Sequence, residues 1–194
     1  MNGIRRKPPS ETALFEAVRL GDRASFEELY HLYYRRLYGY LLRIAGRPEL
    51  VEECINEVMF IVWKDAQRFR GQSRLSTWIF GIAYRQAMKL LQRTEREERE
   101  LPVEAVEAPP PKDPSAELDR RQLRWTLDKA LAKLSPEHRA VVELTFFHDH
   151  SYREVAAIVG CPVNTVKTRM FHARRKLRHF LQPAGLYSPG EART

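Results

Sequence analysis

The sequence predicts an all-α protein in which two small helical domains are joined by a flexible linker. Apolar residues recur every three or four positions in both halves of the 194-residue chain, which is typical of helices with one buried face. Prolines gather between the halves, and no run alternates apolar and polar residues over the length of a strand. We expect domains at 13–96 and 119–182, a linker at 97–118 and a disordered tail at 183–194.

The amino-terminal domain opens its helical pattern with a single apolar stripe. The residues of this stripe are Phe26, Leu29, Tyr30, Tyr33, Leu37, Leu41 and Ile44. Gly46-Arg47-Pro48 ends the helix, because proline cannot continue it. A second helix is expected from about Glu49 to Phe69. After a loop at 70–73, a third helix is expected from about Ser76 to Arg93.

The second helix has a polar face with an aromatic residue at its centre. On a helical wheel the inward positions are Val51, Ile55, Val58, Met59, Val62, Ala66 and Phe69. The outward positions are Glu53, Asn56, Glu57, Phe60, Lys64 and Gln67. An exposed aromatic side chain in such a place is typical of a protein-docking hot spot, so Phe60 is a candidate. The alternative is a rim aromatic that a neighbouring helix covers.

Charge divides the chain in the same way as the helical pattern. Residues 1–93 carry 16 basic and 10 acidic side chains, residues 94–120 carry 4 and 9, and residues 121–194 carry 13 and 6. Two basic blocks around an acidic one suggest two nucleic-acid-facing modules and a connecting segment. The prolines that favour an extended linker there are Pro102, Pro109, Pro110, Pro111 and Pro114.

The carboxy-terminal domain contains the pattern of a helix-turn-helix. Ser135 followed by Pro136 predicts a helix start, and Ser-Tyr-Arg-Glu at 151–154 forms a capping box. Alanine lets two helices cross closely, glycine tolerates the turn, and valine packs the second helix on the first. The residues at this spacing are Ala156, Gly160 and Val166.

The last long helix is the strongest candidate for DNA recognition. Its predicted buried stripe is Val166, Met170, Ala173, Leu177 and Leu181. Between Thr165 and Leu181 there are six lysines or arginines and no carboxylate. A solvated helix usually mixes charge signs, whereas a uniformly basic face suits the DNA major groove. Phe171 on this face favours a contact such as a thymine methyl group. The alternative is an ordinary basic surface helix.

The sequence argues against several other classes of function. Cys54 and Cys161 lack metal-ligand spacing, so we expect reduced cysteines that act in packing, and a cytoplasmic location. Neither a signal peptide nor a membrane-spanning apolar run is visible, so no direct membrane insertion is expected. No catalytic residue, cofactor or metal is expected either. The run His148-Asp149-His150 is interpreted as a solvated turn rather than a metal site.

The carboxy-terminal domain resembles region four of sigma factors, especially those of the extracytoplasmic-function group. The similar stretches are 130–137, 151–156, 160–169 and 173–177. The resemblance implies a helix-turn-helix that reads the minus-thirty-five promoter element. Together with the basic face, it points to contacts by Asn164, Thr165, Lys167, Thr168, Arg169, Phe171, His172, Arg174 and Arg175. His172 stands where an arginine is common, so the promoter sequence is not carried over from any relative.

The amino-terminal domain resembles region two of the same family at 51–63 and 68–79. The resemblance implies a helical bundle that binds a coiled coil of the polymerase β′ subunit. The residues implied for this contact are Glu53, Asn56, Glu57 and Phe60. The loop and the next helix imply capture of an unstacked base of the minus-ten element, through Arg68, Arg70, Gln72, Ser73, Arg74, Trp78 and Arg85. For Trp78, burial beside Ile79 and Ile82 is favoured over this contact.

The resemblance also implies the partners of the protein. They are core RNA polymerase, contacted at the β′ coiled coil and the β flap, promoter DNA, and an anti-sigma factor. Promoter-specific initiation by such a complex leaves the catalysis to the polymerase, so the chain itself is expected not to be an enzyme. One alternative is a free-standing helix-turn-helix repressor or activator that dimerises through its amino-terminal half. Another is a scaffold protein without a DNA role.

Overall fold

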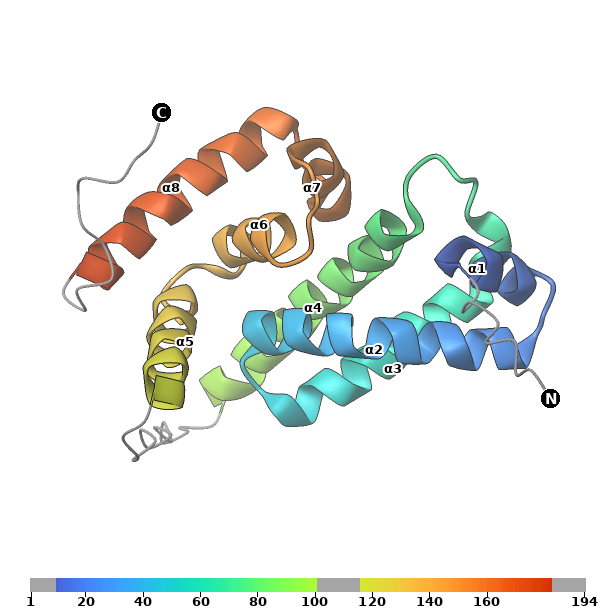
Figure 1. Cartoon of the computed structure of the whole chain (residues 1–194), viewed down its shortest axis with the longest axis horizontal. Coiled ribbons are helices and arrows are strands. Elements are labelled where there is room, and N and C mark those ends of the chain that lie inside the picture. Colours follow the sequence, from blue (N-terminus) through green and yellow to red (C-terminus); the bar gives the residue numbers. More distant parts are fainter. Residues whose placement is uncertain (1–9, 101–115, 183–194) are drawn as a thin grey trace.

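The computed structural model describes the backbone of residues 10–100 and 116–182, and the side chains of residues 10–96 and 124–182. All regular elements in these ranges are helices, which confirms the all-α class, and they form two modules (Figure 1). The ends of the predicted linker at 97–118 are helical. The rest of that linker, and the predicted tail at 183–194, lie outside the described residues.

Four α-helices and a 3-10 turn build the amino-terminal module. They are α1 (Glu11–Arg19), α2 (Arg23–Ala45), α3 (Pro48–Lys64), η1 (Ala66–Arg68) and α4 (Leu75–Glu100). Ser10 and Asp22 accept backbone hydrogen bonds at the starts of α1 and α2. Gly46 ends α2 with φ 72°, a left-handed conformation that favours glycine. The predicted stop at Gly46-Arg47-Pro48 is therefore confirmed.

Two elements of this module differ from the prediction. No helix is predicted before Phe26, yet α1 buries Leu14, Phe15 and Val18. Three apolar residues over two turns are too short a pattern to distinguish a helix from a loop. The second helix ends at Lys64 rather than near Phe69, because the chain tightens into η1 after the C-cap residue Asp65.

The core of the amino-terminal module follows the predicted apolar faces. The buried residues of α2 are Leu29, Tyr33, Leu37, Tyr40, Leu41 and Ile44. Those of α3 are Val51, Cys54, Ile55, Val58, Met59 and Val62. Phe26, Tyr30 and Phe69 lie half-buried at the edge of this core. A three-to-four-residue apolar spacing thus located the faces that pack together.

The carboxy-terminal module contains α5 (Ala116–Ala132), α6 (Pro136–Phe146), α7 (Tyr152–Val159) and α8 (Val163–Leu181). Ser135 caps α6, with its hydroxyl accepting from the backbone N–H of His138. The capping box of Ser151 and Glu154 at the start of α7 is confirmed. Gly160 ends α7 with φ 67° and so makes the turn between the two helices of the helix-turn-helix.

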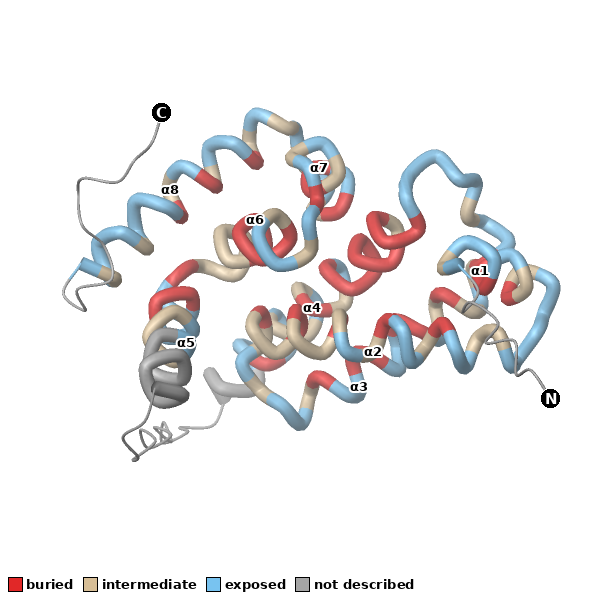
Figure 2. Tube along the Cα trace, viewed as in Figure 1, coloured by how far each residue is buried: buried red, intermediate tan, exposed pale blue. Residues whose placement is uncertain are grey.

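The two modules lie against each other. α7 packs on α4, and α2 contacts both α6 and α5 (Figure 1). Buried residues follow the first half of α4, where it faces the carboxy-terminal module (Figure 2). Among the described residues, no helix combines the length and the apolar character that a membrane crossing requires.

Candidate nucleic-acid and protein-docking surfaces

Helix α8 is held by one apolar face. Val166, Met170 and Ala173 are buried against α6 and α7, and Leu177 is half-buried. Pro162 is the N-cap residue, and its side chain makes no capping hydrogen bond. The first backbone N–H groups of α8 therefore lack a side-chain cap, and a helix start of this kind favours negatively charged groups.

The opposite face of α8 is open to solvent. The exposed residues of the predicted DNA-contacting set are Asn164, Lys167, Thr168, Phe171, Arg174 and Arg175, and the half-buried ones are Thr165, Arg169 and His172. Phe171 keeps 63% of its surface exposed. Its ring meets that of the neighbouring His172, with 5.5 Å between the ring centres, and most of the side chain stays open to solvent, which suits a contact outside the fold.

Three of these residues have neighbours that bear on their roles. The Thr168 hydroxyl donates to the Asn164 carbonyl at 3.0 Å, a local helical contact that leaves the face unchanged. The Arg174 guanidinium lies 5.6 Å from the centre of the Phe146 ring, beside an apolar groove. Arg169 lies close to Tyr84 of α4, where its charge lowers the pKa of the phenol against the larger rise caused by burial.

The loop before α4 carries the predicted minus-ten residues. Arg70, Gln72 and Ser73 are exposed, and Gly71 between them adopts φ 68°. The Arg68 guanidinium is 3.1 Å from the Asp65 carboxylate. Exposed polar groups around a left-handed glycine form a loop that can approach a nucleotide closely. Arg85, about three helical turns into α4, is also exposed.

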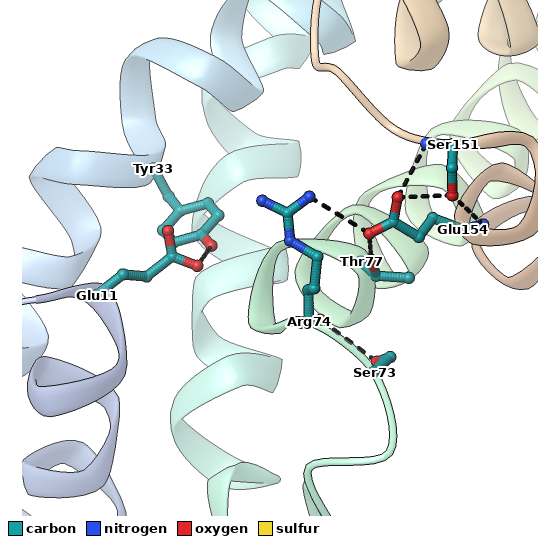
Figure 3. Close-up of polar contacts among 7 residues, drawn as sticks. All are labelled: Glu11, Tyr33, Ser73, Arg74, Thr77, Ser151 and Glu154. Atoms are coloured by element: carbon teal, nitrogen blue, oxygen red, sulfur yellow. Dashed lines mark hydrogen bonds and ion pairs between the residues drawn. The ribbon is translucent and has the colours of Figure 1, made fainter.

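Arg74 and Trp78 have contacts within the protein. The Arg74 guanidinium lies 3.4 Å from the Glu154 carboxylate of α7, so it meets the other module (Figure 3). Trp78 is half-buried, with its ring centre 5.7 Å from that of Phe15 and 5.1 Å from that of Phe69. Burial was the favoured role of Trp78, and the structure gives its ring the aromatic neighbours Phe15 and Phe69.

The predicted polymerase-docking residues of α3 lie on one surface. Glu53, Asn56, Glu57 and Phe60 are all exposed, and Phe60 keeps 57% of its surface accessible. The hydroxyl of Tyr30 donates to the Asn56 side-chain carbonyl at 2.8 Å. Phe60 borders a groove of about 440 Å³ whose lining is Arg23, Phe26, Tyr30, Asn56, Met59, Phe60 and Trp63. An apolar groove with an aromatic rim is suited to an apolar side chain of another protein.

A second apolar groove lies in the carboxy-terminal module and was not predicted. It measures about 380 Å³ and is lined by Leu127, Leu131, Val142, Phe146, Phe147, Arg174, Leu177, Arg178 and Leu181. Phe146 and Phe147 are 56% and 42% exposed. Two consecutive aromatic residues at a helix end cannot both face one core. In the sequence, this pair was the feature that could have predicted the groove.

The interpretation of residues 148–150 as a solvated turn is wrong for both histidines. His150 is buried, and its ring centre lies 5.3 Å from that of Phe80. The His148 ring lies 4.5 Å from the same Phe80 ring and 5.7 Å from that of Tyr40. The loop packs on the amino-terminal module, which a pattern within the loop could not reveal. Within the described residues, no three histidine, cysteine or acidic side chains form a metal-binding group.

Family comparisons match both modules. Residues 29–97 match the family described as Sigma-70 region 2, and residues 124–177 match Sigma-70, region 4. The chain is 32% identical to the ECF RNA polymerase sigma factor RpoE of Cereibacter sphaeroides, covering 87% of this chain and 93% of the relative. It is 27% identical to the ECF RNA polymerase sigma-E factor of Escherichia coli, covering 90% and 95%.

Solved structures show the same fold. The sigma factor RpoE from Bartonella quintana, in complex with the anti-sigma factor NepR, aligns with a TM-score of 0.65 at 24% identity, over 81% of this chain and 96% of that one. CnrH, in complex with the cytosolic domain of CnrY, aligns with a TM-score of 0.64 at 20% identity, over 88% and 96%. At these identities the likeness concerns the fold alone.

Proposed function

This chain belongs to the extracytoplasmic-function group of RNA polymerase sigma factors, and from that premise we propose that it docks on core RNA polymerase and directs it to particular promoters. The observation that carries the proposal is the presence of both sigma modules in the family's order, each with an exposed surface suited to its part. One module offers an aromatic docking face, and the other offers a helix without outward carboxylates.

Promoter recognition is assigned to α8 and to the loop before α4. In α8, Lys167 and Arg175 can hold phosphates or reach base edges, while Phe171 meets an apolar group such as a thymine methyl. In the loop, Arg70 and Gln72 can hold the backbone and the edge of an unstacked base. In these assignments the carboxy-terminal module binds the minus-thirty-five element, and the amino-terminal module binds the minus-ten element.

Polymerase docking is assigned to the exposed face of α3. Phe60 and the groove beside it supply the apolar contact, and Glu53 and Glu57 supply a negative rim that favours a basic partner surface. In the family this partner is the β′ coiled coil. The groove between α5, α6 and α8 has Arg174 and Arg178 at its edge. It suits the β flap, which would bind there through an apolar segment with acidic flanks.

Three further expectations rest on family membership. An anti-sigma factor would act by covering the docking surfaces. The polymerase supplies the catalytic centre, so the chain needs no catalytic residue or cofactor of its own. The site of action would be the cytoplasm, where the polymerase works.

The test is run-off transcription with purified core polymerase, this chain and a library of genomic fragments. We expect discrete transcripts that depend on the chain and a co-purifying complex with the core enzyme. The Lys167→Ala variant is tested in parallel. It should still form the complex with core polymerase but lose the transcripts. Absence of any complex at low salt would contradict the proposal, and so would a dimer that protects a palindromic site without polymerase.

A further inference from the structure

The start of α6 brings a histidine to one edge of α8. Arg169, His172 and Lys176 recur at three- and four-residue steps, so their side chains lie along the same edge of α8. His138, the third residue of α6, faces this edge, and the centre of its ring lies 6.3 Å from that of His172. Both histidines are half-buried. Two imidazoles from different helices thus share one place on the surface, and these four residues are called the histidine cluster below.

One ring nitrogen of His138 is held by its own helix. Its Nδ1 atom lies 2.7 Å from the hydroxyl oxygen of Ser135, the N-cap residue of α6. The hydroxyl can donate to a neutral imidazole or accept from a protonated one, so this contact holds the ring in both states. The Nε2 atom is then the one that a ligand can reach. A protonated His138 would present an N–H donor at that atom.

Permanent charges surround the two imidazoles. Lys176 and Arg169 act on His138 from α8, and the Glu137 carboxylate acts on it from α6. Two cations against one carboxylate leave a single positive charge while both imidazoles are neutral, and protonation of both adds two more. A metal cation would need the neutral rings as ligands and would be repelled by the neighbouring cations. The histidine cluster therefore favours an anion over a metal.

These surroundings make the proton on His138 depend on a bound anion. Burial lowers the pKa of His138 below its ordinary value of 6.5, and the charges of Lys176 and His172 lower it further. Arg169 acts in the same direction and Glu137 in the opposite one. The His138 imidazole is therefore largely neutral at about pH 7.5. A phosphate group that offsets the neighbouring cations would raise this pKa, so a proton would be taken up as phosphate binds.

We propose that His138 and His172 form a proton-dependent phosphate site, which holds a backbone phosphate of promoter DNA at the edge of α8. Arg169 and His172 belong to the predicted DNA-contacting set, whereas His138 and Lys176 do not, so the site extends that surface to the start of α6. Both imidazoles are protonated while the phosphate is bound. Because binding takes up protons, the affinity for DNA falls as the pH rises. The use of the site on promoters rests on the proposed function, whereas the phosphate site itself does not.

Inorganic phosphate tests the site in the free full-length chain. The titration midpoint of the His138 imidazole is followed by NMR with and without phosphate, at an ionic strength kept constant with chloride, and the signal is assigned by its absence in His138→Gln. We expect phosphate to raise the midpoint by about 0.5 or more. His172→Gln should remove most of this rise. A midpoint that phosphate leaves unchanged would overturn the proposal, and so would an equal rise in His172→Gln.

Promoter DNA tests the site in the complex of the chain with core polymerase. The affinity for a promoter found by run-off transcription is measured at about pH 6 and pH 8 for the parent, His138→Gln and His138→Lys. Relative to His138→Gln, the parent should lose about tenfold in affinity between the two pH values. His138→Lys carries a permanent charge and should keep its affinity at both, which a purely structural role of His138 would not produce. Comparison between variants cancels the pH dependence that all of them share.

The salt dependence of the same binding separates a phosphate contact from a change in fold. At pH 6 the salt slope of the parent should exceed that of His138→Gln by about one, and at pH 8 the two slopes should agree. His31→Gln, which removes an exposed histidine of α2, is the control and should behave as the parent. Equal pH dependence in the parent and His138→Gln would overturn the promoter part of the proposal. Failure to bind core polymerase would instead contradict the proposed function, and the phosphate titration of the free chain would still decide whether the site exists.

Discussion

The contact between the modules changes the pKa of a single residue, His148. Burial, with the charges of Arg36, His150 and Arg43, lowers the pKa of His148 from 6.5 to about 4. Both arginines belong to α2, and the ring packs on Phe80 and Tyr40 of the amino-terminal module. Its Nε2 atom is buried and finds no hydrogen-bonding partner among the described residues. The imidazole is therefore accommodated in its neutral form.

The depressed pKa of His148 predicts a loss of stability in acid. Because the folded-state pKa lies below the unfolded one, the contribution is complete above about pH 6.5 and is lost as the pH falls towards 4. Between pH 7.5 and pH 5 the free energy of unfolding should drop by about 2 kcal/mol more in the parent chain than in His148→Gln. Urea titrations at the two pH values measure this. The exposed His31→Gln is the control, and an equal drop in parent and His148→Gln would contradict the prediction.

Phe60 is the residue through which polymerase docking can be tested. Its exposed ring borders an apolar groove, so its removal should cost contact area at the centre of the interface. Phe60→Ala should weaken the binding of core polymerase by about 2 kcal/mol or more, measured by competition for the core enzyme. Leu32→Ala, which removes another exposed apolar side chain outside the groove, should leave the affinity unchanged. Unchanged affinity in Phe60→Ala would make Phe60 an ordinary rim residue.

At the scale of the element, α8 divides into a packed face and a binding face. The first is fixed by Val166, Met170 and Ala173, which are buried. The second holds a row of cations whose charges no acidic residue of α8 offsets. This arrangement lets the helix enter a groove without weakening its own attachment. Substitutions on the outer face should therefore change binding and leave folding intact.

Lys167→Ala and Arg175→Ala test which part of the DNA the helix reads. A contact with a base edge predicts a loss of roughly 1–3 kcal/mol that depends on the promoter sequence. A phosphate contact predicts a uniform loss and a salt slope reduced by about one. Holoenzyme binding to promoter variants across a salt series separates the two cases. Arg35→Ala, which removes a charge from the exposed side of α2, is the control, and variants indistinguishable from it would exclude α8 from the interface.

At the scale of the whole molecule, the modules share polar contacts to which each contributes a residue. Glu143 is the clearest case, because burial raises its pKa to about 7 while Arg43 of the other module pulls it down. Arg139 likewise satisfies carbonyls on both sides. Shared sites of this kind make the unfolding of one module dependent on the other, and we expect the described parts of the chain to unfold together.

Arg43→Gln tests this coupling. Without the guanidinium, Glu143 loses its partner from α2, so the chain should lose about 2 kcal/mol of stability, and the modules should unfold in separate transitions. Differential scanning calorimetry measures both effects. Arg35→Gln, on the exposed side of the same helix, removes the same charge and should keep a single transition of unchanged midpoint. A single unshifted transition in Arg43→Gln would show that the modules are not coupled through this residue.

The sequence alone determined the helices with long apolar stripes, the helix-turn-helix and the family, because each is encoded by local spacing. Caps such as Ser151 and Gly160 and faces such as that of α8 depend on neighbours within a few residues. The docking and DNA-contacting residues named from the sequence lie on surfaces that suit them, and their roles stay predictions.

Only the tertiary structure decided what the modules do to each other. The loop histidines became buried, Arg74 acquired Glu154, and Arg43 and Arg139 acquired partners about a hundred positions away. Such contacts produce no periodic pattern in the sequence, because each involves single residues. The apolar spacing of the helices that carry them is already explained by packing within each module. Which side chains become buried or paired between the modules depends on how the two module surfaces pack in three dimensions. That packing depends on the shape and the charge of both surfaces.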